Sequence, residues 1–226
     1  MRAAARGHWE TLMARDGHEF AAFMAAPAGI PRGSVVILQE IFGVNAHIRS
    51  VVERYAAEGF IAIAPALFDR IERHVELGYT PPDIEKARGY MLQLDEAKTL
   101  LDVSAAVNVV RHAGHVALVG FCWGGQVAWI AASQLPVNAA VSYYASRLWQ
   151  KLERVPTCPM LFHFGERDAG IPLEQVEKVR AAFPQGIYHF YPADHGFACD
   201  ARSQFDASSA QLAWGRTQDF LRERVG

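Results

Sequence analysis

Cys122 lies in a pattern that places a thiol at the tip of a tight glycine turn, Gly120-Phe121-Cys122-Trp123-Gly124-Gly125. An apolar run precedes the turn and a second one follows it, which predicts a buried strand, a turn and a helix. The Gly-x-Cys-x-Gly spacing is that of a nucleophile elbow, with sulfur in place of the usual hydroxyl. The amides and the positive dipole end of the following helix favour the thiolate. The structural alternative is a buried cysteine in a glycine-rich packing turn.

Asp168 and His195 supply the acid and the base that a thiol nucleophile needs. Asp168 follows a predicted strand over 159–165, and His195 follows the last predicted strand, over 186–191. The chain order of nucleophile, acid and histidine is that of the α/β-hydrolase arrangement. Asp194 adjoins His195 but is expected to point away from it. These features together favour catalysis over a packing role for the thiol.

Predicted strands and helices alternate through most of the chain. Besides those already named, strands are predicted over 34–39, 60–64 and 137–144, and helices over 47–58, 83–111 with a break near Leu94, 173–183 and 208–224. The runs 8–13 and 18–25, joined by Asp16-Gly17, predict a hairpin. The alternation predicts an α/β fold with a mostly parallel sheet and helices on both faces. Ligands bind at the carboxyl ends of such strands, where Glu40 also falls.

Composition predicts one domain over 1–226 with a large core, because hydrophobic residues make up 51% of the chain. The net charge is only -2, and it points to no nucleic-acid or membrane partner. The N-terminus lacks the apolar core of a signal peptide, and three scattered cysteines form no disulfide framework, so a cytoplasmic location is expected. No ligand-spaced set predicts a metal. The irregular stretch 66–82 is expected either to shape a pocket or to be a solvated excursion.

The chain resembles the dienelactone hydrolase family, also called carboxymethylenebutenolidases, of the α/β-hydrolase superfamily. The matching segments are 39–45 (Gln-Glu-Ile-Phe-Gly-Val-Asn), 120–125, 162–165 with Asp168, and 195–197. They span nearly the whole chain in the right order. The resemblance implies an α/β-hydrolase fold and a hydrolase that needs no cofactor and acts on a small lactone or ester.

The resemblance also implies roles for single residues. It implies a Cys-His-Asp triad of Cys122, His195 and Asp168, a Glu40 tied to the resting thiol, and an oxyanion hole from the backbone amides of Ile41 and Trp123. One position departs from the family. Members that act on dienelactone carry His-Ser-Phe-Ala-Arg, whose arginine helps bind the substrate carboxylate, whereas this chain has Cys199 at that position. Arg88 is a weaker match to a second carboxylate-binding arginine.

The sequence therefore predicts a hydrolase that opens a lactone or cleaves an activated ester, as a monomer or small homo-oligomer. The alternative is a non-catalytic protein on the same fold that uses Cys122 to capture a ligand or to sense oxidants. The intact acid and base argue against that alternative, because a sensor needs neither. A purely structural role leaves the placement of four polar residues at strand ends unexplained.

Overall fold

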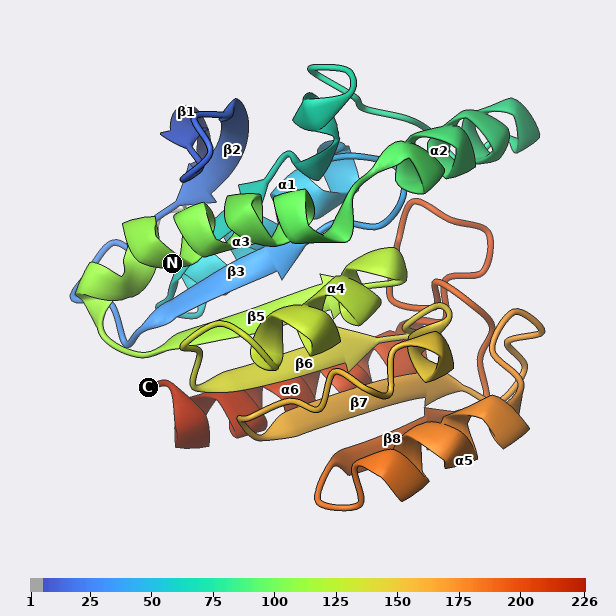
Figure 1. The fold of residues 1–226 in the computed structure, drawn as a ribbon. Helices are drawn as coiled ribbons and strands as arrows, with labels where there is room; N and C mark the ends of the chain where they lie inside the picture. Colours follow the sequence, from blue (N-terminus) through green and yellow to red (C-terminus); the bar gives the residue numbers. More distant parts are fainter. Residues whose placement is uncertain (1–5) are drawn as a thin grey trace. The chain divides into compact units, whose positions relative to one another are not determined.

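The computed structural model describes residues 6–226 (Figure 1). It divides into two compact units, one running to Val116 with Val225, and the other comprising Ala117–Arg224 with Gly226. Residues 1–5 lie outside the described residues. They begin the N-terminal segment that the sequence predicts not to be a signal peptide. A single domain over 1–226 stays a prediction, and each unit is described by itself.

The first unit holds four strands in the order β1-β2-β4-β3. Strands β1 (His8–Met13) and β2 (Glu19–Ala25) form the predicted antiparallel hairpin, with Gly17 in the turn at a φ of 82°. Strand β4 (Ile61–Pro65) pairs antiparallel with β2 and parallel with β3 (Ser34–Leu38). Every residue of β3 and β4 is buried, as continuous apolar runs predict for strands covered on both faces.

Helices cover both faces of these strands. Helix α1 (Ala46–Ala57) begins at Asn45, whose side chain accepts a hydrogen bond from the amide of Ile48. Helix α3 (Glu96–Val110) crosses in front of the strands, and α1 lies behind them (Figure 1). Helix α2 (Pro81–Gln93) precedes α3, and the break between them falls at the predicted position.

The stretch 66–82 is more regular than the sequence predicts. Its start forms a short 3₁₀ helix, Leu67–Arg70, and α2 begins at Pro81, inside the stretch expected to be a loop. A proline is tolerated in the first helical turn because its missing N–H has no partner there anyway. Thr80 and Asp83 form a reciprocal capping box that fixes this start.

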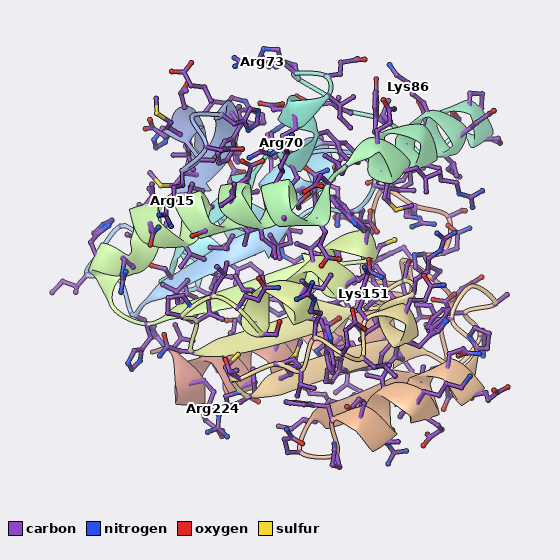
Figure 2. The ribbon with its side chains drawn as sticks, in the orientation of Figure 1. Arg15, Arg70, Arg73, Lys86, Lys151 and Arg224 are labelled. Carbon is purple, nitrogen blue, oxygen red and sulfur yellow. The ribbon has the colours of Figure 1, made fainter. Side chains whose placement is uncertain are left out.

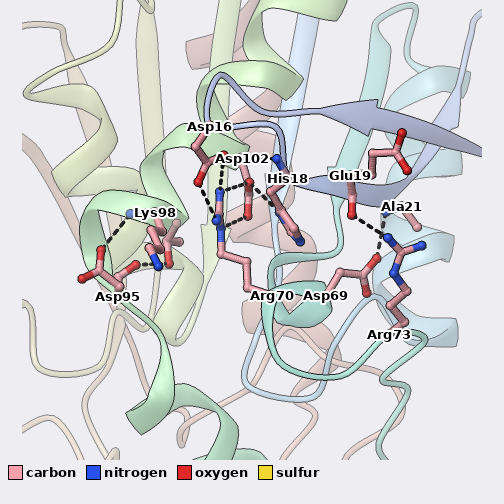
Figure 3. Close-up of polar contacts among 11 residues, drawn as sticks. Asp16, His18, Glu19, Ala21, Asp69, Arg70, Arg73, Asp95, Lys98 and Asp102 are labelled. Carbon is pink, nitrogen blue, oxygen red and sulfur yellow. Dashed lines mark hydrogen bonds and ion pairs between the residues drawn. The ribbon is translucent and has the colours of Figure 1, made fainter.

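A polar cluster anchors this stretch to its own unit (Figure 3). The Arg70 guanidinium donates from Nη2 to Oδ1 of Asp102 at 2.6 Å, from Nε to Oδ2 at 2.7 Å, and from Nη1 to Asp16 at 2.9 Å. His18 Nδ1 lies 3.2 Å from Asp102 Oδ1. Burial raises the pKa of the Asp102 carboxyl even with Arg70 and His18 beside it. Arg73, also labelled in Figure 2, lies exposed at the outer edge of the unit.

The second unit holds four parallel strands in the order β5-β6-β7-β8. Their bounds are β5 (Val116–Phe121), β6 (Ala139–Tyr143), β7 (Met160–Gly165) and β8 (Ile187–Tyr191). Strands β5, β6 and β7 are buried along their whole length. Because the strands run in one direction, their carboxyl ends meet at one edge, and the segments after them form a single surface.

Helices also cover both faces here. They are α4 (Trp123–Ala132), α5 (Leu173–Ala182) and α6 (Ala207–Arg224), with a 3₁₀ turn η3 (Leu148–Gln150). Helix α6 lies behind β6 and β7, and α4 lies in front (Figure 1). Between residues 6 and 226, no helix combines the length and the apolar character needed to cross a bilayer.

A buried hydrogen-bond network ties α6 to the strands. His163, on β7, is fully buried and lies 2.8 Å from the Tyr191 hydroxyl and 2.9 Å from Thr217 Oγ1. The Tyr143 hydroxyl lies 2.7 Å from the same Thr217 oxygen. Burial lowers the pKa of His163 well below its ordinary value, so this histidine is neutral at pH 7. The network fixes the end of β8, just before the loop that carries His195.

Candidate active site

Cys122 occupies a strained turn between β5 and α4. Its φ is 53° and its ψ is -117°, a conformation that side chains other than glycine rarely adopt. The Cys122 amide donates to the carbonyl of Tyr143 at 3.0 Å, and its own carbonyl accepts from Gly125 at 3.0 Å. A Cβ on Gly120 would lie 2.0 Å from the carbonyl oxygen of Gly124. The backbone therefore has the form of the predicted elbow, and the glycine spacing follows from close contact across the turn.

The imidazole of His195 lies between Cys122 and Asp168. Its Nε2 is 3.2 Å from the Cys122 sulfur, and its Nδ1 is 2.7 Å from Oδ2 of Asp168. The other Asp168 oxygen accepts from the Gly170 amide at 2.9 Å, and only 1% of this side chain is exposed. Exposed Asp194 instead accepts from the main-chain amide of His195 at 2.6 Å. The structure thus brings together the three residues that the sequence selects, and it leaves Asp194 apart.

The charges around His195 favour its protonated form. Burial works against the imidazolium, but the charge of Cys122 and the hydrogen bond to Asp168 outweigh it and raise the pKa of His195 to about 10. The ring of Tyr144, fully buried, meets the imidazole edge-on with centroids 5.2 Å apart. An imidazolium beside the sulfur is the partner that stabilises a thiolate.

The loop after His195 turns its side chains into the core. Phe197 is fully buried and packs edge-on against Tyr144 at 5.4 Å. Gly196 has a φ of 80°, and a Cβ there would lie 2.6–2.9 Å from atoms of the Arg202 guanidinium. Cys199 is fully buried as well. The side chain of Cys199, at the position of the family arginine, is therefore part of the core. A different cation, the Arg202 guanidinium, lies against the loop.

Glu40 and Ile41 belong to the first unit and follow β3 after one residue, Gln39. Glu40 is 1% exposed, so a carboxyl group is held away from water at the carboxyl end of a buried strand. The preceding Gln39 is fully buried, and its Oε1 accepts from the amide of Leu67 at 3.2 Å. This bond joins the end of β3 to the start of the stretch 66–82.

The segment after Ile41 is held by the far end of the same stretch. Leu77 donates to the carbonyl of Phe42 at 2.9 Å, and Gly43 forms an isolated bridge with Glu76. Gly43 has a φ of 80°, and a Cβ there would lie 1.8 Å from the carbonyl oxygen of Val75. Only glycine fits this approach. The Gln-Glu-Ile-Phe-Gly signature thus has a physical reason at both its ends.

Sequence reasoning missed Ser146, whose hydroxyl lies 3.2 Å from the Cys122 sulfur. This residue comes three positions after the end of β6, the strand beside β5. A polar residue just beyond the carboxyl end of the neighbouring strand was the available signal. Serine is common in connecting segments, so its type alone does not single it out there.

The other two cysteines differ from Cys122 in their surroundings. Cys158 is buried two residues before β7, and burial raises the pKa of its thiol to about 11. Cys199 lies in the core under the His195 loop, and none of the three cysteines forms a disulfide. Within the described part of the chain, no group of three or more His, Cys, Asp or Glu side chains is arranged to hold a metal ion.

Comparison with known proteins gives the same family over nearly the whole chain. The model of the dienelactone hydrolase family matches residues 20–225. Carboxymethylenebutenolidase of Pseudomonas putida is 36% identical over 225 residues, covering 93% of this chain and 94% of that protein. Carboxymethylenebutenolidase 1 of Cupriavidus pinatubonensis is 31% identical over 220 residues, covering 93% and 94%.

Solved structures agree with the family match. A Klebsiella pneumoniae protein, 29% identical, superposes with a TM-score of 0.82 and covers 95% of this chain and 98% of its own. Dienelactone hydrolase from Anabaena variabilis, 15% identical, has a TM-score of 0.70, covers 99% and 100%, and shows the likeness of fold alone. The expected fold class and hydrolase class are confirmed. The chain therefore belongs to the dienelactone hydrolase family and is a hydrolase with the α/β-hydrolase fold.

Proposed function

We propose that this hydrolase opens a lactone or cleaves an activated ester through a covalent intermediate on Cys122. The observation that carries the proposal is the continuous contact from sulfur to imidazole to carboxylate, 3.2 Å and 2.7 Å long. These are the distances at which a nucleophile, a base and an orienting acid act together. Hydrolysis then needs only a small-molecule substrate, water and groups of this chain.

The first half of the reaction forms a thioester. The Cys122 sulfur attacks the carbonyl carbon, so an S–C bond forms and the carbonyl electrons move onto oxygen. When the tetrahedral adduct collapses, the C–O bond to the leaving group breaks. The imidazolium of His195 gives its Nε2 proton to that leaving oxygen. Asp168, bonded to Nδ1, keeps the ring oriented and stabilises its charge.

The second half releases the acyl group and frees the sulfur. Water attacks the thioester while its proton passes to Nε2 of His195. The S–C bond then breaks, and its electron pair returns to the Cys122 sulfur as a thiolate. Esters and lactones suit this route, because their oxygen leaving groups depart more easily than the nitrogen of an amide.

The family resemblance supports roles for groups outside this triad. The backbone amides of Trp123, the first residue of α4, and of Ile41, after β3, are proposed to stabilise the oxyanion. Glu40, 1% exposed, is proposed to be tied to the resting thiol and to release it when substrate binds. The held segment around Gly43 supports a fixed position for the Ile41 amide within its unit.

The test is turnover of aryl esters and of lactones by purified protein carrying Cys122→Ala. Loss of turnover to the uncatalysed level is expected, because the covalent route needs the sulfur. Cys158→Ala is the matched control, since it removes a buried thiol outside the site and should keep activity. Turnover that survives in Cys122→Ala refutes the mechanism. Saturable binding without turnover by the unaltered chain supports the ligand-binding alternative instead.

The preferred substrate depends on whether this chain binds a carboxylate group of the substrate. Cys199 is buried where dienelactone-specific relatives carry arginine, and Arg88 lies on an exposed part of α2. The guanidinium of Arg202, against Gly196, is proposed to compensate within the second unit. Turnover of lactones with and without a carboxylate tests this role of Arg202. Arg202→Gln should abolish any preference for the lactone that carries a carboxylate, with kcat on neutral esters unchanged. A preference that survives this substitution contradicts the assignment.

A further inference from the structure

The Cys122 sulfur has a second close polar neighbour, from the segment that follows β6. Ser146 Oγ lies 3.2 Å from Sγ, the same distance as His195 Nε2. Resting on the proposed function of Cys122, we propose that Ser146 is a further catalytic residue: its hydroxyl donates a hydrogen bond to the sulfur whenever the sulfur carries negative charge. The sulfur thus has two donors in the thiolate state.

The direction of this hydrogen bond follows from the other contact. An imidazolium facing the sulfur presents an N–H at Nε2, and a thiolate has no proton to give. The sulfur therefore accepts from both sides, and the serine hydroxyl, which rotates freely, is the donor. Hydrogen bonds to an ionised partner are about twice as strong as neutral ones.

The serine is placed by backbone contacts that do not involve its hydroxyl. Three hydrogen bonds fasten the segment to the elbow and to α4, at its start, middle and end: Ser146 amide to the Cys122 carbonyl at 3.3 Å, Gln126 Nε2 to the Arg147 carbonyl at 2.9 Å, and Trp129 Nε1 to the Lys151 carbonyl at 2.9 Å. Two residues that flank the serine adopt strained, positive φ values, Tyr144 at 35° and Arg147 at 54°. The segment is thus rigidly held, and removing the oxygen alone leaves these contacts in place.

The sulfur carries charge twice in each turnover, and the hydroxyl has a different effect each time. Before attack, the hydrogen bond increases the thiolate fraction but makes each thiolate less nucleophilic. In the thioester the sulfur is neutral, so the bond weakens. When the S–C bond breaks and the electron pair returns to sulfur, the hydroxyl stabilises the departing thiolate. Its net effect is to speed release of the acyl group.

Ser146→Ala removes the donor, and two further variants serve as controls. Ser146→Thr keeps a hydroxyl at the same position. Ser133→Ala removes a half-buried hydroxyl in the same unit, one that donates to the Ile130 carbonyl at 2.7 Å at the end of α4. Alkylation of Cys122 by iodoacetamide, followed by mass spectrometry against pH, reports the thiolate. The fraction of enzyme carrying acyl mass after acid quench of aryl ester turnover reports release.

In Ser146→Ala the alkylation midpoint should rise by about one pH unit, a tenfold loss of thiolate at low pH, as one hydrogen bond to a charged group predicts. The acylated fraction in steady state should rise, and kcat should fall about tenfold, while Ser146→Thr and Ser133→Ala match the unaltered protein. The titratable groups of this unit that bear on the sulfur, His195 and Asp168 behind it, are unchanged in every variant.

An unchanged midpoint and an unchanged acylated fraction in Ser146→Ala overturn the inference, and so does an equal shift in Ser133→Ala. Cys122→Ala, run beside them, separates the two proposals. If it is inactive while Ser146→Ala behaves as the unaltered protein, the covalent mechanism stands and the role of Ser146 is wrong. If Cys122→Ala stays active, the proposed function itself fails.

Discussion

Replacing Asp168 with asparagine keeps the size of the side chain and removes the charge that faces His195. The Gly170 amide, 2.9 Å from Oδ1, would hold the asparagine oxygen in place. The asparagine NH₂ group would then face Nδ1 across the present 2.7 Å contact. Because that group donates, Nδ1 must accept, and the single proton of the neutral ring moves to Nε2. The ring can then no longer take a proton from water or thiol.

The size of the effect follows from two contributions. A hydrogen bond to a charged group contributes about 1.5–3 kcal/mol, or roughly 10- to 150-fold in rate. The wrong tautomer adds to this, and the same substitution in a serine triad lowers kcat by about 10⁴. Only 1% of the Asp168 side chain is exposed, so water does not screen the contact. We expect kcat/KM of Asp168→Asn to fall by roughly 10² to 10⁴.

The pH profile adds a second, independent readout. The raised pKa of His195, about 10, means that the imidazolium is present at neutral pH and is lost as the pH rises through about 10. Asp168 is one of the groups that raise this pKa, so the alkaline limb of the kcat/KM profile should move to lower pH in Asp168→Asn.

The assay is kcat/KM for an aryl ester against pH, with Asp194→Asn as the matched control. Asp194 is exposed and accepts only from the main-chain amide of His195 in this loop, so that variant should keep both the rate and the profile. Wild-type kcat/KM in Asp168→Asn, or an equal loss in Asp194→Asn, would refute the role given to the buried carboxylate.

Two further predictions concern stability, both measured by urea unfolding. Gly120→Ala should destabilise the protein by about 3 kcal/mol or more, because its Cβ would lie 2.0 Å from the Gly124 carbonyl oxygen, whereas Gly89→Ala on α2, with nothing within 4 Å, should stabilise it by about 0.5–1 kcal/mol. Equal effects from the two glycines would contradict the strained turn. Arg70→Met should cost about 3–5 kcal/mol, because it leaves Asp102 buried without its bidentate partner, and a loss below about 1 kcal/mol would show that the cluster in Figure 3 contributes little.

Much of the secondary structure follows from local pattern. The apolar runs that became β3, β5 and β7 are short, β-branched or aromatic, and bounded by turn residues. The hairpin turn at Asp16-Gly17 needs only the two residues themselves. Such features depend on neighbours in sequence, so they are readable without the fold.

The stretch 66–82 was harder to predict, for a physical reason. Adjacent prolines at 81 and 82 mark a break in most contexts, but at the start of a helix they are tolerated. The anchoring of Arg70 depends on Asp102, which lies 32 residues away in sequence. No local pattern records such a pairing, since it exists only when two elements pack together.

The sequence by itself determined which residues are proposed to carry the chemistry. The elbow spacing selected Cys122, chain order and strand ends selected Asp168 and His195, and a family signature placed Glu40 and Ile41 after β3. These are matters of residue type and spacing. The fold then decided what such patterns do not contain: the 3.2 Å and 2.7 Å contacts, the raised pKa of His195 and the hydroxyl of Ser146 beside the sulfur. Distance, burial and charge arise only when segments far apart in sequence are packed against one another.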